Sequence, residues 1–260
     1  MRRGSFPVWV EARNPLPGRG GSPAQSFRRG RSPQPELSTA DGLVVVECSL
    51  SPRRTDRYRV SVEDGAGGRR AVSLPDVFVA RNAIRVGVEL EHAQADALVS
   101  AASECDAYDR AIGALGRRAY ARAELERWLM QRGIAGSVAR AQVARLVDLG
   151  VVDDERFAAD FVRARISRRG ASTWELRRDL GRKGVAREIA DAAIRAVASD
   201  AGLDDSAVAR RAAASKWRAL QRLAPDVAKR RLVAFLRRRG FGGEIVANVV
   251  RDVVNMERTA

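Results

Sequence analysis

Three copies of one short pattern limit the possible folds of this chain more than any other feature. The pattern is leucine, two variable residues, a basic residue, glycine and an apolar residue, and it occurs at Leu129–Ile134, Leu180–Val185 and Leu236–Phe241. In a Schellman motif glycine is left-handed just past the helix cap, and the apolar residue after it folds back onto the leucine. The basic side chain would oppose the negative end of the helix dipole. The pattern therefore predicts that a helix ends at each copy.

Apolar residues recur at matched positions around the three glycines. Another leucine lies eight residues before each glycine, on the same helical face as the first. Apolar residues follow each glycine at five, ten and thirteen positions, which predicts a second helix: Val138, Val143 and Leu146; Ile189, Ile194 and Val197; Ile245, Val250 and Val253. The glycines lie 51 and 56 residues apart, so each copy has room for a third helix. We expect stacked units that form an elongated, curved rod.

The chain divides into five expected parts. Residues 1–41 are rich in Pro, Gly, Ser and Arg and have no apolar periodicity, which predicts a disordered basic tail. Residues 42–104 contain strand patterns at 43–48, 57–62 and 70–74 and a Gly-rich turn at 63–68, which predict a small α/β module. Three three-helix, helix-turn-helix-like repeats would follow at 105–152, 153–200 and 201–260. The expected fold class is mainly α.

Several local signals mark element boundaries. Pro75 can start a short helix that ends near Ile84, and Gly87 separates it from a long helix expected from about Glu91 to Arg118. Helices of the first repeat are expected near 106–118, 122–132 and 137–149. Acidic residues at 153–155 favour the start of a helix, and Ser172 with Glu175 has the spacing of a capping box. The second and third repeats would therefore begin at acidic helix starts, the latter near Asp204.

The charge of the chain is strongly positive and unevenly distributed. The formal net charge is +15, with +5 in residues 1–40, −2 in 41–105 and +12 in 106–260. An excess of this size on the helical repeats indicates a polyanionic partner, either nucleic acid itself or a nucleoprotein assembly. The other interpretation is a solvated basic surface with no partner.

The two cysteines and the hydropathy bear on the compartment. Cys48 and Cys105 are isolated, with no CxxC pattern, which fits a reduced, cytoplasmic setting. No apolar run approaches the length needed to span a bilayer. We therefore expect a cytoplasmic protein, a monomer without a membrane partner.

Residues that could carry catalysis or hold a cofactor are few. His92 is the only histidine, which makes a nucleophilic triad or a zinc site improbable, and the chain contains no P-loop pattern. An acidic group (Asp153, Asp154, Glu155 and Asp160) is better explained as a helix start than as a metal cluster. Cys105 is expected to be a small buried hydrophobe. We expect no catalytic residue, no cofactor and no metal, and hence no enzyme.

Several of these segments together resemble the RecX family, regulators of the bacterial RecA recombinase. The likeness is carried by Ala123–Gly133, Gly150–Arg165, Glu175–Gly184 and Leu232–Phe241, and it covers about residues 43–256. Asp-Asp-Glu-Arg-Phe-Ala followed by Phe-Val-Arg-x-Arg is its most specific part. Where the family often has Ser or Thr, this chain has Ala121, and the loss of that N-cap should cost about 1 kcal/mol.

The resemblance implies tandem three-helix repeats and a non-enzymatic regulatory function. Similar proteins bind RecA and its filament on DNA and restrain filament growth, ATPase activity, strand exchange and coprotease activity, which would place this chain in recombination and the SOS response. Weak, non-specific binding to DNA is expected as well. Two alternatives stay open: a direct DNA-binding regulator that uses its helix-turn-helix-like units, and, ranked last, a metal-dependent enzyme acting on nucleic acid.

Basic side chains are the candidate contacts to the filament or DNA. They fall at helix ends or opposite the apolar stripes, at Arg117, Arg118, Arg163, Arg165, Arg168, Arg169, Arg177, Arg178, Arg182, Lys183, Arg237, Arg238 and Arg239. Each one singly is better explained as a solvated charge or a cap, but together they could form a stripe. Trp128, Trp174 and Trp217 are expected to pack in cores or between repeats.

Overall fold

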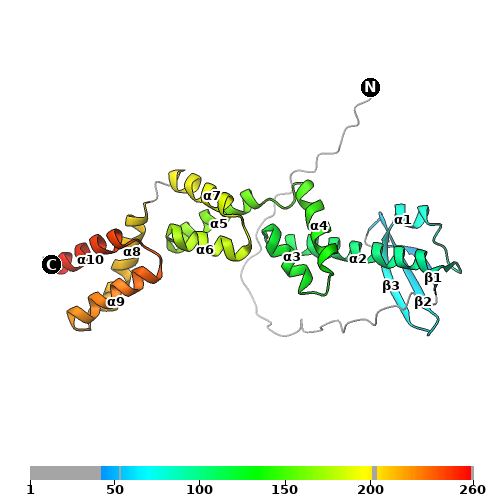
Figure 1. Cartoon of the computed structure of the whole chain (residues 1–260), viewed down its shortest axis with the longest axis horizontal. Helices are drawn as coiled ribbons and strands as arrows, with labels where there is room; N and C mark the ends of the chain where they lie inside the picture. The colour runs from blue at the N-terminus through cyan, green and yellow to red at the C-terminus, as the bar shows by residue number, and fades with distance from the viewer. Residues whose placement is uncertain (1–41, 53, 201–203, 259–260) are drawn as a thin grey trace, which may run out of the picture. The chain divides into compact units, whose positions relative to one another are not determined.

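The N-terminal module is built on a four-stranded antiparallel sheet (Figure 1). The computed structural model describes residues 42–52, 54–200 and 204–258, so the predicted disordered tail lies outside the described residues. The strands are β1 (Leu43–Leu50), β2 (Arg57–Asp64), β3 (Arg69–Pro75) and β4 (Glu89–Leu90), in the order β3-β2-β1-β4. The three predicted strands are confirmed. β4 was not predicted, because two residues are too few to show a strand pattern.

Local hydrogen bonds explain how the hairpin between β2 and β3 closes. Asp64 Oδ1 accepts from the backbone N–H groups of Ala66 and Gly68, at 3.1 and 2.7 Å. Gly67 has φ +79°, which a residue without a Cβ adopts at little cost. After β3 the chain forms helix α1 (Asp76–Arg81), with Pro75 at the N-cap, as its sequence predicts.

One long helix joins the sheet to the first repeat. Helix α2 (His92–Leu115) buries Leu98 with the apolar side chains of the sheet, among them Val60 and Leu74. Three turns further on, its Ala107 and Ala111 belong to a second core, that of the first repeat. The expected boundary between residues 104 and 105 therefore lies inside a continuous helix. The helix predicted at 106–118 is the C-terminal half of α2, which ends at residue 115.

The remaining helices form three repeats of three helices each. Repeat 1 consists of the C-terminal half of α2 with α3 (Arg122–Met130) and α4 (Gly136–Asp148). Repeat 2 contains α5 (Asp154–Arg169), α6 (Thr173–Lys183) and α7 (Arg187–Asp200). Repeat 3 contains α8 (Asp205–Arg218), α9 (Pro225–Arg238) and α10 (Gly243–Arg258). The mainly α fold with three three-helix units is confirmed.

The Schellman motifs predicted from the sequence are present in all three repeats. Gly133, Gly184 and Gly240 have φ of +83°, +86° and +78°. The N–H of the residue after each glycine donates to the carbonyl of the leucine five positions earlier, for example from Val185 to Leu180 at 3.2 Å. Each of these leucines is fully buried, and the apolar residue after the glycine is at most 8 % exposed. Glycine and leucine therefore end the middle helix of each repeat.

Each repeat has a hydrophobic core of its own. The three clusters are centred on Leu125 and Leu129, on Leu176 and Leu180, and on Leu232 and Leu236. Ala121 is an exception, because it lies at the start of α3 but packs in the core of repeat 2. The other described contacts between repeats combine close packing at glycines with hydrogen bonds and ion pairs. The expected elongated, curved rod stays a prediction.

Candidate protein and nucleic-acid interface

Successive repeats meet at one recurring joint, in which the glycine turn of one repeat presses on the middle helix of the repeat before it. A Cβ added at Gly184 would lie 2.5 Å from the Cβ of Ala123, near the start of α3. A Cβ added at Gly240 would lie 2.5 Å from the Trp174 ring, at the matching position of α6. At Gly133, which has no three-helix repeat before it, a Cβ would meet no described atom within 4 Å. At the joints, the absence of a Cβ therefore allows both the left-handed backbone and the close contact between repeats. In repeat 1 it allows only the left-handed backbone.

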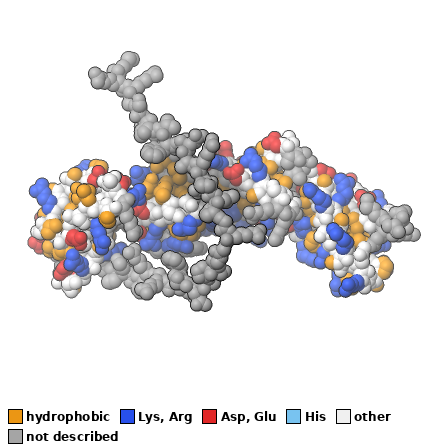
Figure 2. All heavy atoms as spheres, turned by 180° about the vertical axis from the view of Figure 1, so that it is seen from behind, with side chains coloured by type: hydrophobic (Ala, Val, Ile, Leu, Met, Phe, Trp, Pro, Cys, Tyr) orange, Lys and Arg blue, Asp and Glu red, His pale blue; other side chains and the backbone are white. Residues whose placement is uncertain are grey.

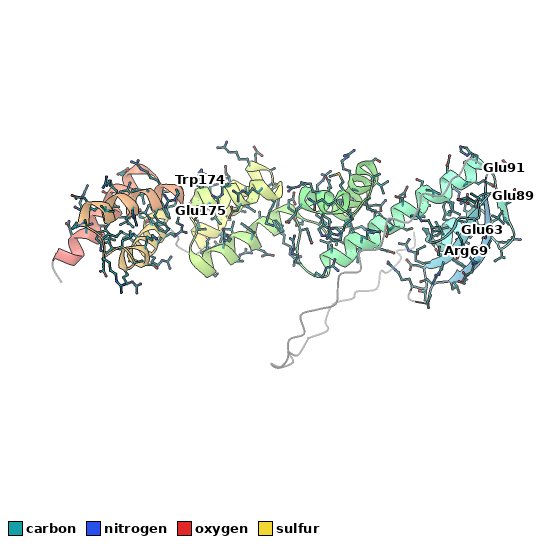
Figure 3. The ribbon with its side chains drawn as sticks, turned by 90° about the horizontal axis from the view of Figure 1, so that it is seen from below. Glu63, Arg69, Glu89, Glu91, Trp174 and Glu175 are labelled. Atoms are coloured by element: carbon teal, nitrogen blue, oxygen red, sulfur yellow. The ribbon has the colours of Figure 1, made fainter. Side chains whose placement is uncertain are left out.

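The basic residue before each of these glycines forms an ion pair across the joint. Lys183 Nζ lies 2.9 Å from Glu124 Oε1, and Arg239 Nη2 lies 3.0 Å from Glu175 Oε2. Both carboxylates occupy the third position of a middle helix, and Trp174 and Glu175 lie where repeat 2 meets repeat 3 (Figure 3). Both cations lie at the C-terminal ends of their helices, as the sequence predicts, and each also has a carboxylate of the preceding repeat as a partner. Arg132, in repeat 1, does donate to a carbonyl at the end of its own helix, that of Trp128.

An aspartate completes each joint. Asp154 Oδ1 accepts from the backbone N–H of Arg122 at 2.7 Å, and Asp205 Oδ1 accepts from the backbone N–H of Thr173 at 3.1 Å. Each aspartate is the first residue of one repeat and caps the middle helix of the repeat before it. The side chain of Asp154 thus satisfies a backbone donor of α3, which Ala121 cannot do for its own helix.

Replacing Asp154 by alanine should therefore destabilise the joint between repeats 1 and 2. We expect a loss of about 1 kcal/mol in the free energy of unfolding, the usual cost of removing an N-terminal cap. Glu155→Ala is the matched control, because it removes an equal charge from the same turn of α5, where Glu155 has no such contact to α3. Urea denaturation followed by circular dichroism measures both, and equal losses would contradict the capping function.

Most of the predicted basic stripe is paired with carboxylates. Eight of the candidates have an acidic partner within 4.0 Å: Arg118 with Glu124, Arg163 with Asp160, Arg165, Arg178 and Arg182 with Asp179, Arg177 with Asp191, Lys183 with Glu124, and Arg239 with Glu175. Burial raises the pKa of the Asp179 carboxyl, but hydrogen bonds from Arg178 and Arg165 outweigh it, so the net pKa is lowered. The candidates of repeat 2 therefore stabilise the protein itself as well as adding to its surface charge.

Three candidates differ from these. Arg117, Arg237 and Arg238 are exposed and form no ion pair within the part of the chain that the structure describes. The side chains of Arg168 and Arg169 lie outside the described part. Pairing with carboxylates offsets part of the charge that these positions in the sequence imply, and the predicted stripe stays a prediction.

Repeat 3 carries cations that the sequence interpretation missed. Residues 204–258 contain thirteen Lys and Arg against six Asp and Glu, a net charge of +7, whereas 153–200 contain eleven against nine. Figure 2 shows Lys and Arg side chains gathered over this C-terminal repeat, at the right of that view. Counting charge for each repeat separately could have found this concentration in advance. Repeat 3 is thus the most basic of the three repeats.

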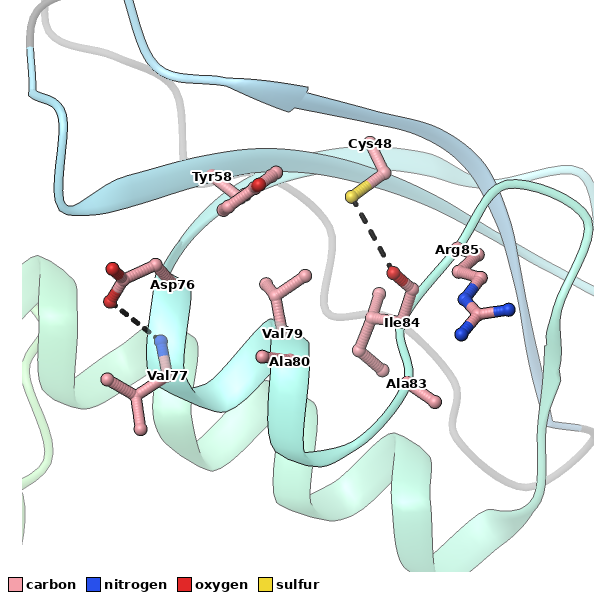
Figure 4. A pocket seen from close by; sticks show the side chains of 9 residues that line it. All are labelled: Cys48, Tyr58, Asp76, Val77, Val79, Ala80, Ala83, Ile84 and Arg85. Atoms are coloured by element: carbon pink, nitrogen blue, oxygen red, sulfur yellow. Dashed lines mark hydrogen bonds between the residues drawn. The ribbon is translucent and has the colours of Figure 1, made fainter.

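A shallow pocket of about 380 Å³ lies beside α1 in the N-terminal module (Figure 4). Its wall includes Cys48, whose Sγ lies 3.8 Å from the carbonyl oxygen of Ile84. Burial raises the pKa of the Cys48 thiol, so it is a poor nucleophile. Cys105 is buried, as predicted, and the Arg57 guanidinium contacts its Sγ. Burial raises the pKa of the Cys105 thiol despite the nearby guanidinium, so neither thiol has the setting of a reactive cysteine.

The acidic residues singled out from the sequence have structural partners. Asp153 accepts from the backbone N–H groups of Glu155 and Arg156 as the N-cap of α5, and Asp160 pairs with Arg163 at 3.0 Å. His92 lies 3.4 Å from Asp96. Within the described ranges no group of three His, Cys, Asp or Glu side chains is arranged to hold a metal ion. None of the described helices combines the length and apolarity needed to cross a bilayer.

The three tryptophans pack as the sequence predicts. Trp217 is 7 % exposed in the core of repeat 3. Trp128 packs edge-on to Tyr120 at 6.1 Å, beside the core of repeat 1. Trp174 keeps 46 % of its surface exposed but contacts the turn at Gly240, so it packs between repeats 2 and 3.

Comparisons with known proteins agree with this architecture. Models of the second and third three-helix domains of RecX match residues 153–194 and 204–250. The regulatory protein RecX of Chlorobaculum tepidum is 35% identical over 152 residues, which are 58% of this chain and 90% of that protein. The regulatory protein RecX of Mycolicibacterium vanbaalenii is 36% identical over 153 residues, 55% of this chain and 80% of its own length.

A solved structure shows the same fold. The crystal structure of a regulatory protein RecX aligns with a TM-score of 0.62 at 18% identity, over 81% of this chain and 99% of that one. The matched family models cover repeats 2 and 3. With identity above a third over nearly the whole of a relative, this chain belongs to the RecX family of regulatory proteins.

Proposed function

We propose that this chain restrains the RecA recombinase by binding RecA and the groove of its nucleoprotein filament, acting by occupancy and without catalysis. The observation that carries the proposal is the net charge of +12 on the helical repeats of a protein from a family of regulators. A filament that contains DNA presents a regular array of phosphates, and repeated units with a positive surface complement such an array.

The described residues support binding rather than chemistry. Asp160 and Asp179 pair with arginines, Asp153 caps a helix, and burial raises the pKa of both thiols. Repeated joints hold cations of successive repeats in fixed positions, for example Lys183 against Glu124 and Arg239 against Glu175. Such a protein would act by its shape and its positive potential.

Titration of the full chain into a RecA ATPase and strand-exchange assay on single-stranded DNA tests the proposal. We expect both activities to fall at less than one molecule per RecA subunit, because one bound molecule on a growing filament blocks the addition of further subunits. Added salt should weaken the effect, since contacts to phosphate are screened. Unchanged ATPase and strand-exchange rates at equimolar protein would contradict the proposal.

Binding assays without RecA separate the proposal from a sequence-specific DNA regulator. We expect weak binding to any DNA, with strong salt dependence and tighter binding once RecA coats the strand. Selection of one duplex site over random duplex by about a thousandfold, as in specific regulators, would instead favour the helix-turn-helix alternative.

A further inference from the structure

A groove of about 690 Å³ lies between repeats 2 and 3. One wall comes from the C-terminal end of α5, with Arg165 and Gly170, and from the start of α6, with Glu175. The other comes from α8, with Arg211 and Lys216, and from α9, with Phe235 and the adjoining Arg239. The groove therefore spans the joint described above.

The lining of the groove is strongly cationic. Four basic side chains line it against one carboxylate, Glu175, and that carboxylate is already bonded to Arg239 at 3.0 Å. Arg165 is paired with Asp179, which is not among the lining residues. Arg211 and Lys216 have no ion-pair partner in the part of the chain that the structure describes. With these two pairs counted as neutral, Arg211 and Lys216 leave a net charge of about +2 in one concave site, which attracts an anion more strongly than the same charges would on a flat surface.

One polar atom in this lining lacks a hydrogen-bond acceptor. Arg165 Nε is buried and has no partner, although its Nη2 donates to Asp179 at 2.6 Å. The Arg165 side chain keeps 39% of its surface exposed, so its guanidinium adds positive charge to the groove wall while Nη2 stays bonded to Asp179.

The remaining lining indicates the class of anion. Small residues form much of the wall, including Gly170, Ala171, Ala212 and Ser215, so an extended strand can approach the helix backbones. Phe235 adds a partly buried aromatic ring, with Lys216 Nζ 5.8 Å from its centroid. A cationic channel of small residues with an aromatic ring suits a single strand, whose flexible backbone can follow the groove while a base contacts the ring.

We propose that the groove between repeats 2 and 3 binds the phosphodiester backbone of single-stranded DNA, through Arg211 and Lys216, with Arg165 adding positive charge to the groove wall. This inference rests on the proposed function, since the strand in question is the one that RecA coats. The proposal places the DNA contact at a joint between repeats. Arg211 and Lys216 were not among the candidates selected from the sequence, whereas Arg165 was.

Direct binding of single-stranded DNA in the absence of RecA tests the groove. The probe is a fluorescent oligothymidine of about 20 nucleotides, measured by anisotropy with the full chain. For Arg211→Glu with Lys216→Glu we expect the affinity at low salt to fall at least about tenfold. The slope of log affinity against log salt should also shrink by about 1.4, which corresponds to two lost phosphate contacts on a single strand.

The matched control is Arg218→Glu with Arg222→Glu. These exposed residues belong to the same repeat, and the change in charge is the same, but neither lines the groove. The control should lose much less affinity than the groove variant and should keep most of the salt slope. Equal losses in the two variants would overturn the proposal, because the whole surface charge of repeat 3 would then explain the binding.

Further outcomes distinguish the remaining explanations. Circular dichroism checks that the helices are intact, and Arg211→Gln with Lys216→Gln provides a milder variant, expected to lose affinity in the same direction, if the reversed one unfolds. A groove variant that binds the oligonucleotide normally but no longer inhibits RecA would overturn the nucleic-acid assignment in favour of an acidic protein surface. If it binds and inhibits normally, the groove proposal fails while the proposed regulation of RecA stands.

Discussion

Gly184→Ala should destabilise this protein far more than the same change at Gly133. Both glycines have φ above +80°, so each alanine pays about 1–2 kcal/mol for a left-handed backbone. Only at Gly184 does the new methyl group meet a neighbour, 2.5 Å from the Cβ of Ala123. Forcing repeats 1 and 2 apart adds about 1–3 kcal/mol, as overpacking does in a core. The expected total at Gly184 is about 2–5 kcal/mol.

Gly133→Ala is the internal control for this prediction. It has the same Schellman geometry, and its methyl group would meet no described atom within 4 Å, so only the conformational cost applies. The free energies of unfolding of the three proteins can be compared by guanidinium denaturation. Similar values for the two variants would show that the close packing at the joint does not contribute to stability.

The joint between repeats 1 and 2 should weaken in acid because of Glu124. Burial raises the pKa of this carboxyl, but hydrogen bonds from Arg118 and Lys183 outweigh the effect and the net pKa is lowered. A carboxyl whose pKa is lower in the folded than in the unfolded protein stabilises the fold above its unfolded value, about 4.3. That stabilisation is lost as the pH falls through the folded value. Folding should therefore become less favourable below about pH 4.5.

Glu124→Gln isolates the contribution of this carboxylate. The neutral amide keeps the size of the side chain and removes the pH-dependent contribution. The variant should therefore be less stable than the wild type near pH 7, by about 2 kcal/mol for a partly buried pair. This difference in stability should shrink toward pH 3. Glu126→Gln is the control, since among the described residues Glu126 pairs only with Arg122, on its own helix. Thermal unfolding between pH 3 and pH 7 measures the effect, and a pH-independent difference would count against it.

These joints explain why charge counted along the sequence overstates the available positive surface. In repeat 2 the basic residues Arg165, Arg178 and Arg182 surround one carboxylate, Asp179, and Lys183 reaches into repeat 1. Arg165 lies 14 residues from Asp179, and Lys183 lies 59 residues from its partner Glu124, so a local pattern does not show either pair. Repeat 3 has fewer acids, so more of its cations stay available to an external anion.

The sequence alone determined the repeat architecture, because helix ends depend on local chemistry. The Schellman motif needs only residues within six positions of one another: a glycine past the cap, a leucine one turn earlier and an apolar residue after the glycine. It ends a helix without any distant partner. The capping box at Ser172 and Glu175, the acidic helix starts and the stacked pair Phe157 and Phe161 were predictable for the same reason.

Only the tertiary structure decided which of these residues also connect repeats. Asp154 looks like an ordinary first-turn acid, and Lys183 like an ordinary C-terminal cation, yet both contact α3 of the preceding repeat. The groove likewise combines Arg165 of α5 with Arg211 of α8 and Phe235 of α9, which lie 46 and 70 residues further along the chain. Ion pairs between repeats and the groove depend on how the helices are arranged in space, which a local sequence pattern does not encode. The residue at which a helix ends depends on its neighbours in the sequence, which such a pattern does encode.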